Sequence, residues 1–168
     1  GLANLLSDQG DYAGAEPLYR RALAGREKAL GPEHPSTLGS VNNLADLLRH
    51  QGDYAGAEPL YRRALAGREK ALGPEHPDTL GSVNKMGITL NALGRLPDAV
   101  QLLREKAALS PKALEAVRYN LACYECLSGN HAEARRLIAE ELAVNPEKRE
   151  QALQDEDLKA IHDYIKTL

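Results

Sequence analysis

Apolar residues in the first half of the chain recur with the spacing of an α-helix. They fall at positions i, i+3, i+4 and i+7, which places their side chains on one helical face. These residues are Val41, Leu44, Ala45 and Leu48. Gly52 favours the left-handed conformation that ends a helix, and Asp53 is a typical N-cap for another. The pattern therefore predicts a helical hairpin whose second helix extends from Tyr54 to about Leu72.

The second predicted helix has an apolar face of its own, but it contains one residue that disfavours a helix. The inward residues are expected to be Ala57, Leu60, Tyr61, Ala64 and Leu65. Pro59 would lie inside this helix, where proline removes a backbone hydrogen bond at a cost of roughly 3 kcal/mol. Because both flanks are strongly amphipathic, we expect a helix that is kinked at Pro59 but continuous, and the same at Pro17.

The hairpin occurs twice with almost no change. Residues 9–35 are repeated without a mismatch as residues 51–77. The next position differs, but Ser36 and Asp78 are both good helix N-caps. A period of this length is typical of solenoids, in which each hairpin buries its apolar face against its neighbours. Repeats this similar indicate a recent duplication or a designed array.

These motifs resemble a known family. The patterns Asn-Leu-Ala-x-Leu-Leu, Gly-Asp-Tyr-x-x-Ala and Leu-Tyr-x-x-Ala-Leu are similar to a tetratricopeptide repeat (TPR). The repeat length and the Gly-Pro-Glu-His-Pro-x-Thr connector resemble the repeats of kinesin light chains. The resemblance implies an all-α fold, a right-handed α-α superhelix (TPR solenoid) of about four helical hairpins with a C-terminal capping helix. The implied single TPR domain covers 1–168, divided into a truncated repeat 1 (1–36), repeat 2 (37–78), repeat 3 (79–112), repeat 4 (113–146) and a C-terminal cap (147–168).

The last part of the chain carries weaker versions of the same signals. Asn130 followed by Glu133 is a capping-box analogue that predicts the start of the second helix of repeat 4. The segment after residue 146 resembles the cap of such arrays, and Asp155 and Asp157 place acid at a helix start. The apolar face expected for this cap consists of Leu158, Ile161 and Ile165.

The first residues of the chain align with the interior of a first helix. Residues 1–3 correspond to residues 43–45, so we expect a truncated first repeat. Leu2, Leu5 and Leu6 would then form an exposed apolar edge, which predicts weak self-association or fraying. No targeting signal can be read from this end, and a cytoplasmic location is the expectation.

Composition and charge narrow the possible functions. Leu and Ala are the most abundant residues, Phe and Trp are absent, and this composition argues against an all-β fold. A formal net charge of −3 gives no basic excess for nucleic-acid binding, and no apolar run of about 18 residues could span a membrane. No Gly-rich phosphate loop, nucleophile elbow or paired-His metal helix occurs. We expect a protein that is not an enzyme and needs no cofactor or metal.

The TPR resemblance implies that the first helix of each hairpin lines a concave groove. Residues opposite the buried face of these helices would point into the groove, because helical geometry fixes which side chains share a face. The candidate groove residues are Asn4, Ser7, Asp8, Asn42, Asn43, Asp46, Arg49, His50, Asn84, Lys85, Ile88, Asn91, Tyr119, Asn120 and Cys123. Asn side chains offer both a donor and an acceptor, which suits an extended peptide backbone. We therefore expect a protein–protein interaction module that binds a peptide or protein segment of unknown identity.

Other functions stay open at the level of sequence. The groove could be solvated and without a ligand, or the array could be a structural spacer or an oligomerisation arm. Similar bacterial arrays often form the sensor region of larger signalling proteins, which the resemblance makes a further alternative.

Two observations sharpen the expected groove. Asn42 and Asn84 are equivalent positions one repeat apart, and replacing both with Ala should weaken a ligand while the melting temperature hardly changes. Lys85 and its neighbouring Asn residues partly resemble a carboxylate clamp, which holds a C-terminal acid. Asp8 and Asp46 would repel that carboxylate, so the clamp is the less favoured alternative.

Cys123 and Cys126 form a C-x-x-C motif, a spacing found in redox sites and in half of a zinc site. A zinc site needs four ligands, and the sequence has no second pair of cysteines. The motif is expected in the middle of a helix, not at an N-terminus that would lower the pKa of a thiol. We expect two reduced, metal-free thiols that serve as small groove residues. A thiol-redox or metal enzyme is the least favoured alternative.

Histidine and arginine residues recur in both copies of the repeat. His34 and His76 lie in the connectors, where we expect loop-fixing hydrogen bonds and not a metal site. Pairs of arginines at 20–21 and 62–63 lie on second helices and are expected to be solvated charges on the outer face.

Overall fold

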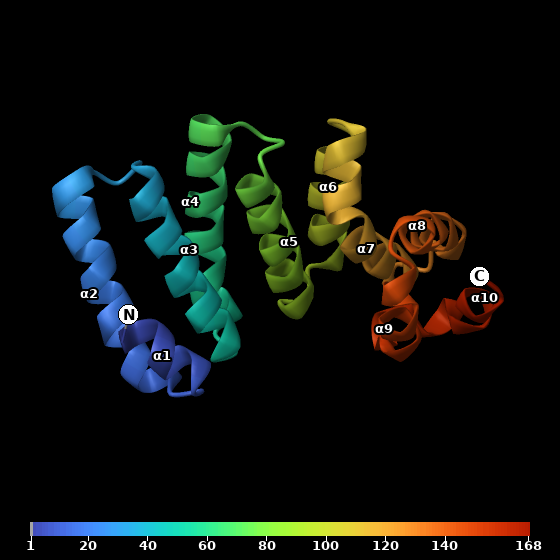
Figure 1. The fold of residues 1–168 in the computed structure, drawn as a ribbon, viewed down its shortest axis with the longest axis horizontal. Helices are drawn as coiled ribbons and strands as arrows, with labels where there is room; N and C mark the ends of the chain where they lie inside the picture. Colours follow the sequence, from blue (N-terminus) through green and yellow to red (C-terminus); the bar gives the residue numbers. More distant parts are fainter. Residues whose placement is uncertain (1) are drawn as a thin grey trace. The chain divides into compact units, whose positions relative to one another are not determined.

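The computed structural model describes residues 2–168 and is built from helices alone, with no strand in that range (Figure 1). The α-helices are α1 (Leu2–Asp8), α2 (Tyr12–Leu30), α3 (Pro35–His50), α4 (Tyr54–Leu72), α5 (Pro77–Ala92), α6 (Leu96–Ala107), α7 (Pro111–Leu127), α8 (His131–Val144), α9 (Arg149–Gln154) and α10 (His162–Thr167). Two 3-10 helices, η1 (Pro146–Lys148) and η2 (Glu156–Ile161), flank α9. None of the helices in this range is long and apolar enough to cross a membrane. The all-α class expected from the sequence is confirmed.

The chain folds as two compact units, Gly1–Leu93 and Gly94–Leu168. In the first unit each helix from α1 to α5 packs against the next along the chain. In the second unit α6 packs on α7, α7 packs on α8, and the short C-terminal helices close over α7 and α8. The core of each unit consists of the apolar faces of these hairpins, with Leu44 and Tyr61 buried in the first unit and Leu103 and Leu137 in the second. The repeat boundaries expected from the sequence stay predictions.

The helix limits of the hairpin follow the local signals. Helix α4 extends from Tyr54 to Leu72, as predicted. The Asp53 carboxylate caps it by accepting a hydrogen bond of 2.9 Å from the backbone N–H of Gly56. Gly52 has a φ of +80°, the left-handed conformation that ends α3. The predicted hairpin is confirmed at the turn between α3 and α4 and in the span of α4.

Both prolines lie inside uninterrupted helices. Pro59 belongs to α4 and Pro17 to α2, and each helix continues on either side of it. One proline removes a single backbone hydrogen bond, while the apolar face of the whole helix remains buried against its neighbours. The expectation of continuous helices is confirmed.

The connector histidines cap the next helix. His34 Nδ1 accepts a hydrogen bond of 3.1 Å from the backbone N–H of Ser36, and His76 Nδ1 accepts one of 3.2 Å from Asp78. The expected loop-fixing hydrogen bonds are therefore confirmed. An N-cap role for Ser36 and Asp78 is wrong, because the proline before each takes the first helical position that proline favours. The cap consequently moves to the histidine.

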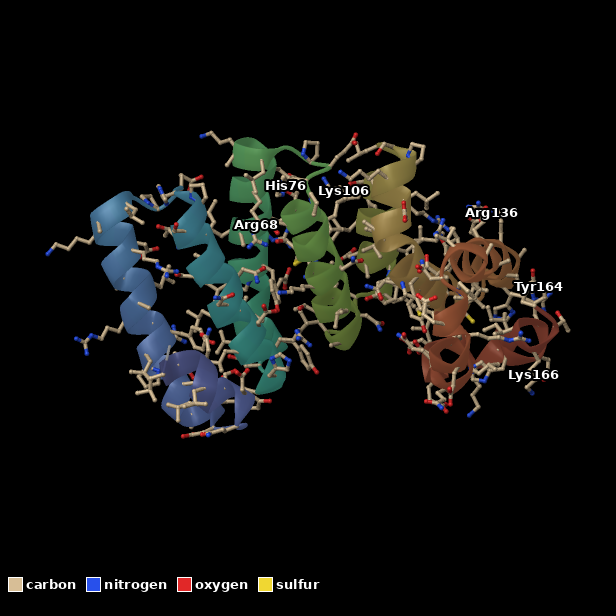
Figure 2. All side chains as sticks on the ribbon, viewed as in Figure 1. Arg68, His76, Lys106, Arg136, Tyr164 and Lys166 are labelled. Atoms are coloured by element: carbon tan, nitrogen blue, oxygen red, sulfur yellow. The ribbon has the colours of Figure 1, made fainter. Side chains whose placement is uncertain are left out.

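An arginine on each second helix joins it to the first helix of the following hairpin. Arg68 Nη1 donates to Ser82 Oγ at 2.7 Å and to the carbonyl of Asp78 at 3.0 Å (Figure 2). Arg26 makes the same contact with Ser40 Oγ, at 2.5 Å. Sequence analysis missed these arginines, although their recurrence together with a serine fourteen positions later is visible in both copies.

The outer-face arginines divide into two kinds. Arg20 and Arg62 are more than half exposed and pair with glutamates of their own helices, as expected for solvated charge. Arg63 differs, because its guanidinium forms an ion pair with Glu27 at 2.7 Å and donates a hydrogen bond of 3.1 Å to the carbonyl of Pro32. The expectation of a solvated Arg63 is wrong, since this side chain links α4 to the preceding hairpin.

The buried carboxylate of Glu125 binds side chains from neighbouring segments of the second unit. Glu125 is 1 % exposed and accepts two hydrogen bonds from Arg104, of 2.5 and 2.7 Å. The Asn130 amide also donates to Glu125, at 3.0 Å, and makes no side-chain cap to α8. The predicted start of this helix is confirmed, because Asn130 is the N-cap residue of α8. The predicted side-chain capping box is wrong, because a buried carboxylate needs donors more than an exposed helix end does. Glu133 pairs instead with Arg136.

The C-terminal cap forms as predicted on its apolar side. Leu158, Ile161 and Ile165 are almost completely buried. Asp155 caps η2 by accepting a hydrogen bond of 3.0 Å from the backbone N–H of Asp157, so acid does lie at a helix start. Because η2 packs against α7, the cap covers the helix that was expected to line a groove.

Candidate functional site

The first unit contains a polar pocket, which we call the α1–α3 pocket. It has a volume of about 220 Å³ and is lined by Asn4, Ser7, Asp8, Tyr19, Asn43, Asp46, Leu47 and His50. All of these except Tyr19 and Leu47 are candidate groove residues from the sequence. Six of the candidate residues, from α1 and α3, therefore line one pocket, and their role in binding stays a prediction.

One tyrosine of α2 and one of α4 each hold a polar residue of the preceding helix in place. The Tyr19 hydroxyl donates to Asn4 Oδ1 at 2.9 Å, and the Tyr61 hydroxyl donates to Asp46 Oδ1 at 2.5 Å. Burial and the hydrogen bond to Asp46 raise the pKa of the Tyr61 hydroxyl well above its usual range, so it stays protonated and donates. Sequence analysis missed Tyr19 because it considered only first helices.

Asp46 is satisfied within the chain. Besides the hydrogen bond from Tyr61, its carboxylate accepts one from Asn42 Nδ2 at 3.0 Å and pairs with Lys85 Nζ at 2.5 Å. Lys85 is therefore engaged by Asp46, which removes the cation that a carboxylate clamp would need. The partial resemblance to a clamp gains no support from this arrangement.

Asn42 does not face an open groove. Its side chain is 3 % exposed, donates to Asp46, and accepts a hydrogen bond from Arg68 Nη1 at 3.4 Å. The premise that Asn42 points into open solvent is therefore wrong, because Asn42 is buried and contacts Arg68 of α4. Asn84, the equivalent residue of α5, is half-buried.

Three side chains of the α1–α3 pocket remain available to a ligand. Ser7, Asp8 and Asn43 make no side-chain hydrogen bond or ion pair within residues 2–168. Asp8 and Asn43 are exposed, and Ser7 is half-buried. The pocket thus offers a carboxylate, a hydroxyl and an amide to whatever enters it.

His50 forms one wall of the pocket and is held in place. Its ring stacks on Tyr12, with centroids 5.9 Å apart, and its Nε2 lies 3.1 Å from Arg49 Nη2. Arginine can only donate, so Nε2 accepts and Nδ1 carries the hydrogen. Arg49, another candidate groove residue, also donates to the Tyr61 hydroxyl at 3.3 Å. Its guanidinium is therefore engaged within the first unit.

The other candidates lie outside this pocket. On α5, Ile88 is 38 % exposed and Asn91 is half-buried. On α7, Asn120 is half-buried, while the Tyr119 hydroxyl donates to Asp155 Oδ2 at 2.9 Å. Tyr119 and Cys123, which were expected to point into an open groove, instead contact Asp155 of the C-terminal segment.

Cys123 shows the effect of the cap most clearly. Its side chain is 3 % exposed, and its Sγ lies 3.7 Å from Asp155 Oδ2. Burial, followed by the charges of Asp155 and Asp157, raises the pKa of this thiol, and burial also raises the pKa of Cys126. Both cysteines are free. Ligand atoms of Cys123, Asp155 and Asp157 lie within 4.8 Å of one another, but a protonated thiol is a poor nucleophile and metal ligand.

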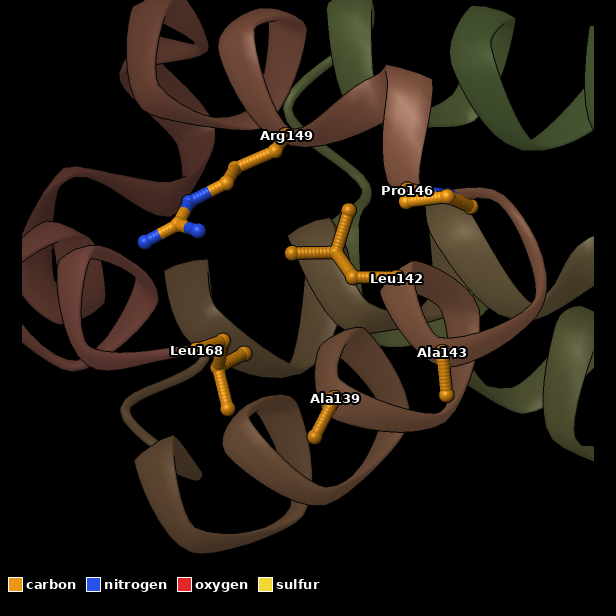
Figure 3. A pocket seen from close by; sticks show the side chains of 6 residues that line it. All are labelled: Ala139, Leu142, Ala143, Pro146, Arg149 and Leu168. Carbon is orange, nitrogen blue, oxygen red and sulfur yellow. The ribbon is translucent and has the colours of Figure 1, made fainter.

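The second unit has a cavity of its own, of about 210 Å³ (Figure 3). Its lining is mostly apolar and consists of Ala139, Leu142, Ala143, Pro146, Arg149 and Leu168. Arg149 Nη2 donates to the carbonyl of Lys166 at 2.7 Å, which ties α9 to α10. No candidate from the sequence lines this cavity, so the α1–α3 pocket is the candidate site.

Comparison with known proteins agrees with this architecture. Family models for the tetratricopeptide repeat match residues 1–36 and 37–78, and residues 85–105. A Podosopora anserina protein named as a kinesin light chain with nearly identical TPR-like repeats has a similar structure, with a TM-score of 0.75 and 24 % identity over 99 % of this chain and 90 % of that one. The structure of BtubC (BKLC) from P. vanneervenii gives a TM-score of 0.77 and 19 % identity over 86 % of this chain and 61 % of that one. No curated protein matches.

Proposed function

Because this chain belongs to the tetratricopeptide repeat family, a non-catalytic scaffold fold for protein interactions, we propose that its first unit binds an extended peptide segment of a partner protein. The segment would lie across α1 and α3, over the α1–α3 pocket. The expected tetratricopeptide repeats are confirmed by the family matches, and the solved structure named as a kinesin light chain shares their fold.

The observation that carries this proposal is the composition of the pocket. Ser7, Asp8 and Asn43 have no partner within residues 2–168, and the Asn4 amide keeps its Nδ2 donors because Tyr19 takes only the oxygen. Donors and acceptors side by side match the alternating N–H and C=O groups of an extended backbone. Each such hydrogen bond contributes about 0.5–1.5 kcal/mol net.

The other parts of the groove face favour the α1–α3 pocket by contrast. Asp46 and Lys85 satisfy each other between α3 and α5, and the cap lies over α7. A ligand would have to displace those contacts before it gained new ones, whereas the α1–α3 pocket requires no such exchange.

A display library of random decapeptides tests the proposal. Selected peptides should bind the Asn43→Ala variant two- to tenfold more weakly, as expected for one or two lost hydrogen bonds. The matched control is Arg62→Ala on the outer face of α4, which should leave affinity unchanged. Peptides that lose affinity only in the control variant would place binding on the outer face. Failure to select any peptide would favour a spacer or an oligomerisation arm.

A further inference from the structure

The same pair of repeat positions faces each other twice, once between α1 and α3 and once between α3 and α5. A shift of 42 residues relates Asn4 to Asp46, and Asn43 to Lys85. The tyrosine hydrogen bonds to Asn4 and Asp46 show that the two positions have the same local geometry. What happens between α3 and α5 therefore indicates what the space between α1 and α3 is shaped to hold.

Between α3 and α5 a lysine fills this space. Lys85 Nζ extends from α5 to Asp46 Oδ2, at 2.5 Å. Between α1 and α3 the corresponding residue is Asn43, whose side chain is shorter and uncharged. Asn43 and Asn4 both line the α1–α3 pocket of about 220 Å³.

The charges around the α1–α3 pocket suit a cation. Two carboxylates line it, Asp8 and Asp46, and no Lys or Arg does. Asp46 is already paired with Lys85, but Asp8 is exposed and has no partner within residues 2–168. The amide oxygen of Asn43 adds a neutral acceptor beside it.

We propose that the α1–α3 pocket binds a lysine side chain of the partner segment, with Asp8 as its counter-ion. The neutral Asn4 stands where Asp46 stands one repeat later, so the carboxylate comes from Asp8, four residues further along α1. This inference rests on the proposed function, because the lysine would belong to the peptide that lies across α1 and α3. It adds a specificity, since a peptide would be recognised by one basic residue and not by its backbone alone.

A lysine analogue tests the pocket without a peptide. Nα-acetyl-lysine methylamide, whose side-chain ammonium is free, is titrated into labelled protein. The side-chain amide signals of Asn4 and Asn43 are followed by NMR. We expect saturable shifts with this probe and none with the norleucine analogue, which has the methylene chain without the ammonium. Asp8→Asn should weaken binding roughly two- to fivefold, as for an exposed ion pair. The charge-matched control Asp163→Asn should not.

Two variants that exchange the residues at the equivalent positions 43 and 85 test the proposal most directly. Asn43→Lys should fold, because Lys85 occupies the equivalent position, and should abolish binding of the probe by filling the pocket from within. Lys85→Asn should do the reverse and open a second site at Asp46, seen as new saturable shifts in α3 and α5. Equal binding by lysine and norleucine probes, or undiminished binding by Asn43→Lys, would overturn the inference.

The two proposals fail separately. If selected peptides lack lysine and still depend on Asn43, the proposed function stands and the lysine site is wrong. If the lysine probe saturates the wild-type pocket but no peptide is selected, the lysine site stands and the peptide function is wrong.

Discussion

Helices α2 and α4 have the same nineteen-residue sequence, yet they bury different residues. Three positions are buried in α4 and at least partly exposed in α2. The buried residues are Tyr61, Ala64 and Gly67, and their counterparts are Tyr19, Ala22 and Gly25. Local sequence therefore produces the same helix twice without producing the same environment.

The difference follows from the neighbours of each helix. Helix α4 packs between α3 and α5, which have sixteen residues each, whereas α2 packs between α3 and the seven-residue α1. Leu38 of α3 lies directly against Gly67, and nothing lies within 4 Å of the same point at Gly25. The comparison teaches that burial in a repeat array belongs to the interface and not to the repeat.

The tyrosine pair should show the largest difference. Tyr61→Ala removes a fully buried ring and should lower the free energy of unfolding by about 3–5 kcal/mol. Tyr19→Ala removes a half-buried ring and one hydrogen bond, so its cost should be closer to about 1 kcal/mol. Urea unfolding followed by circular dichroism measures both. Equal costs would show that the two helices have the same environment after all.

Alanine substitutions at the two equivalent glycines should change the stability in opposite directions. A Cβ at Gly67 would lie 2.6 Å from both methyl carbons of the buried Leu38, so Gly67→Ala should destabilise by about 1–3 kcal/mol. Gly25→Ala meets nothing and should stabilise by roughly 0.5–1 kcal/mol through helix propensity. Thermal and urea unfolding of the two variants give the signs. A stabilising Gly67→Ala would contradict the close approach of α3 and α4.

Adjacent asparagines on α3 extend the comparison to the groove face. Asn42→Ala leaves Asp46 and Arg68 with fewer partners in a buried place and should cost about 1–3 kcal/mol. Asn43→Ala, at an exposed position, should change stability by no more than about 0.5 kcal/mol. Melting temperatures measured side by side provide the check, and a neutral Asn42→Ala would restore the view of Asn42 as an open groove residue.

The smallest effect is expected where the two copies share an environment. Arg20→Ala and Arg62→Ala each remove an exposed pair with a glutamate four residues earlier, so each should cost no more than about 0.5 kcal/mol. The two costs should also be equal within error in urea unfolding. A larger cost at Arg62 would reveal an interaction of α4 beyond its own helix.

The sequence by itself determined the helices and their ends, because those depend on residues close together in the chain. The turn at Gly52, the cap at Asp53 and the span of α4 all follow from local conformational preference and local hydrogen bonds. The periodicity of α1 and α3 also placed six candidates around the α1–α3 pocket. The histidine caps depend on the proline that follows each histidine, because proline favours the first helical position and leaves the cap to the residue before it.

Tertiary structure decided which residues of the predicted groove face stay accessible. Asn42 is covered by Arg68 from the next helix, Lys85 is drawn to Asp46 across 39 residues, and Cys123 is covered by the cap. Periodicity specifies the direction of a side chain relative to its own helix, but burial depends on what distant segments bring against it. For that reason identical residues of α2 and α4 differ in exposure, and the open pocket lies between α1 and α3.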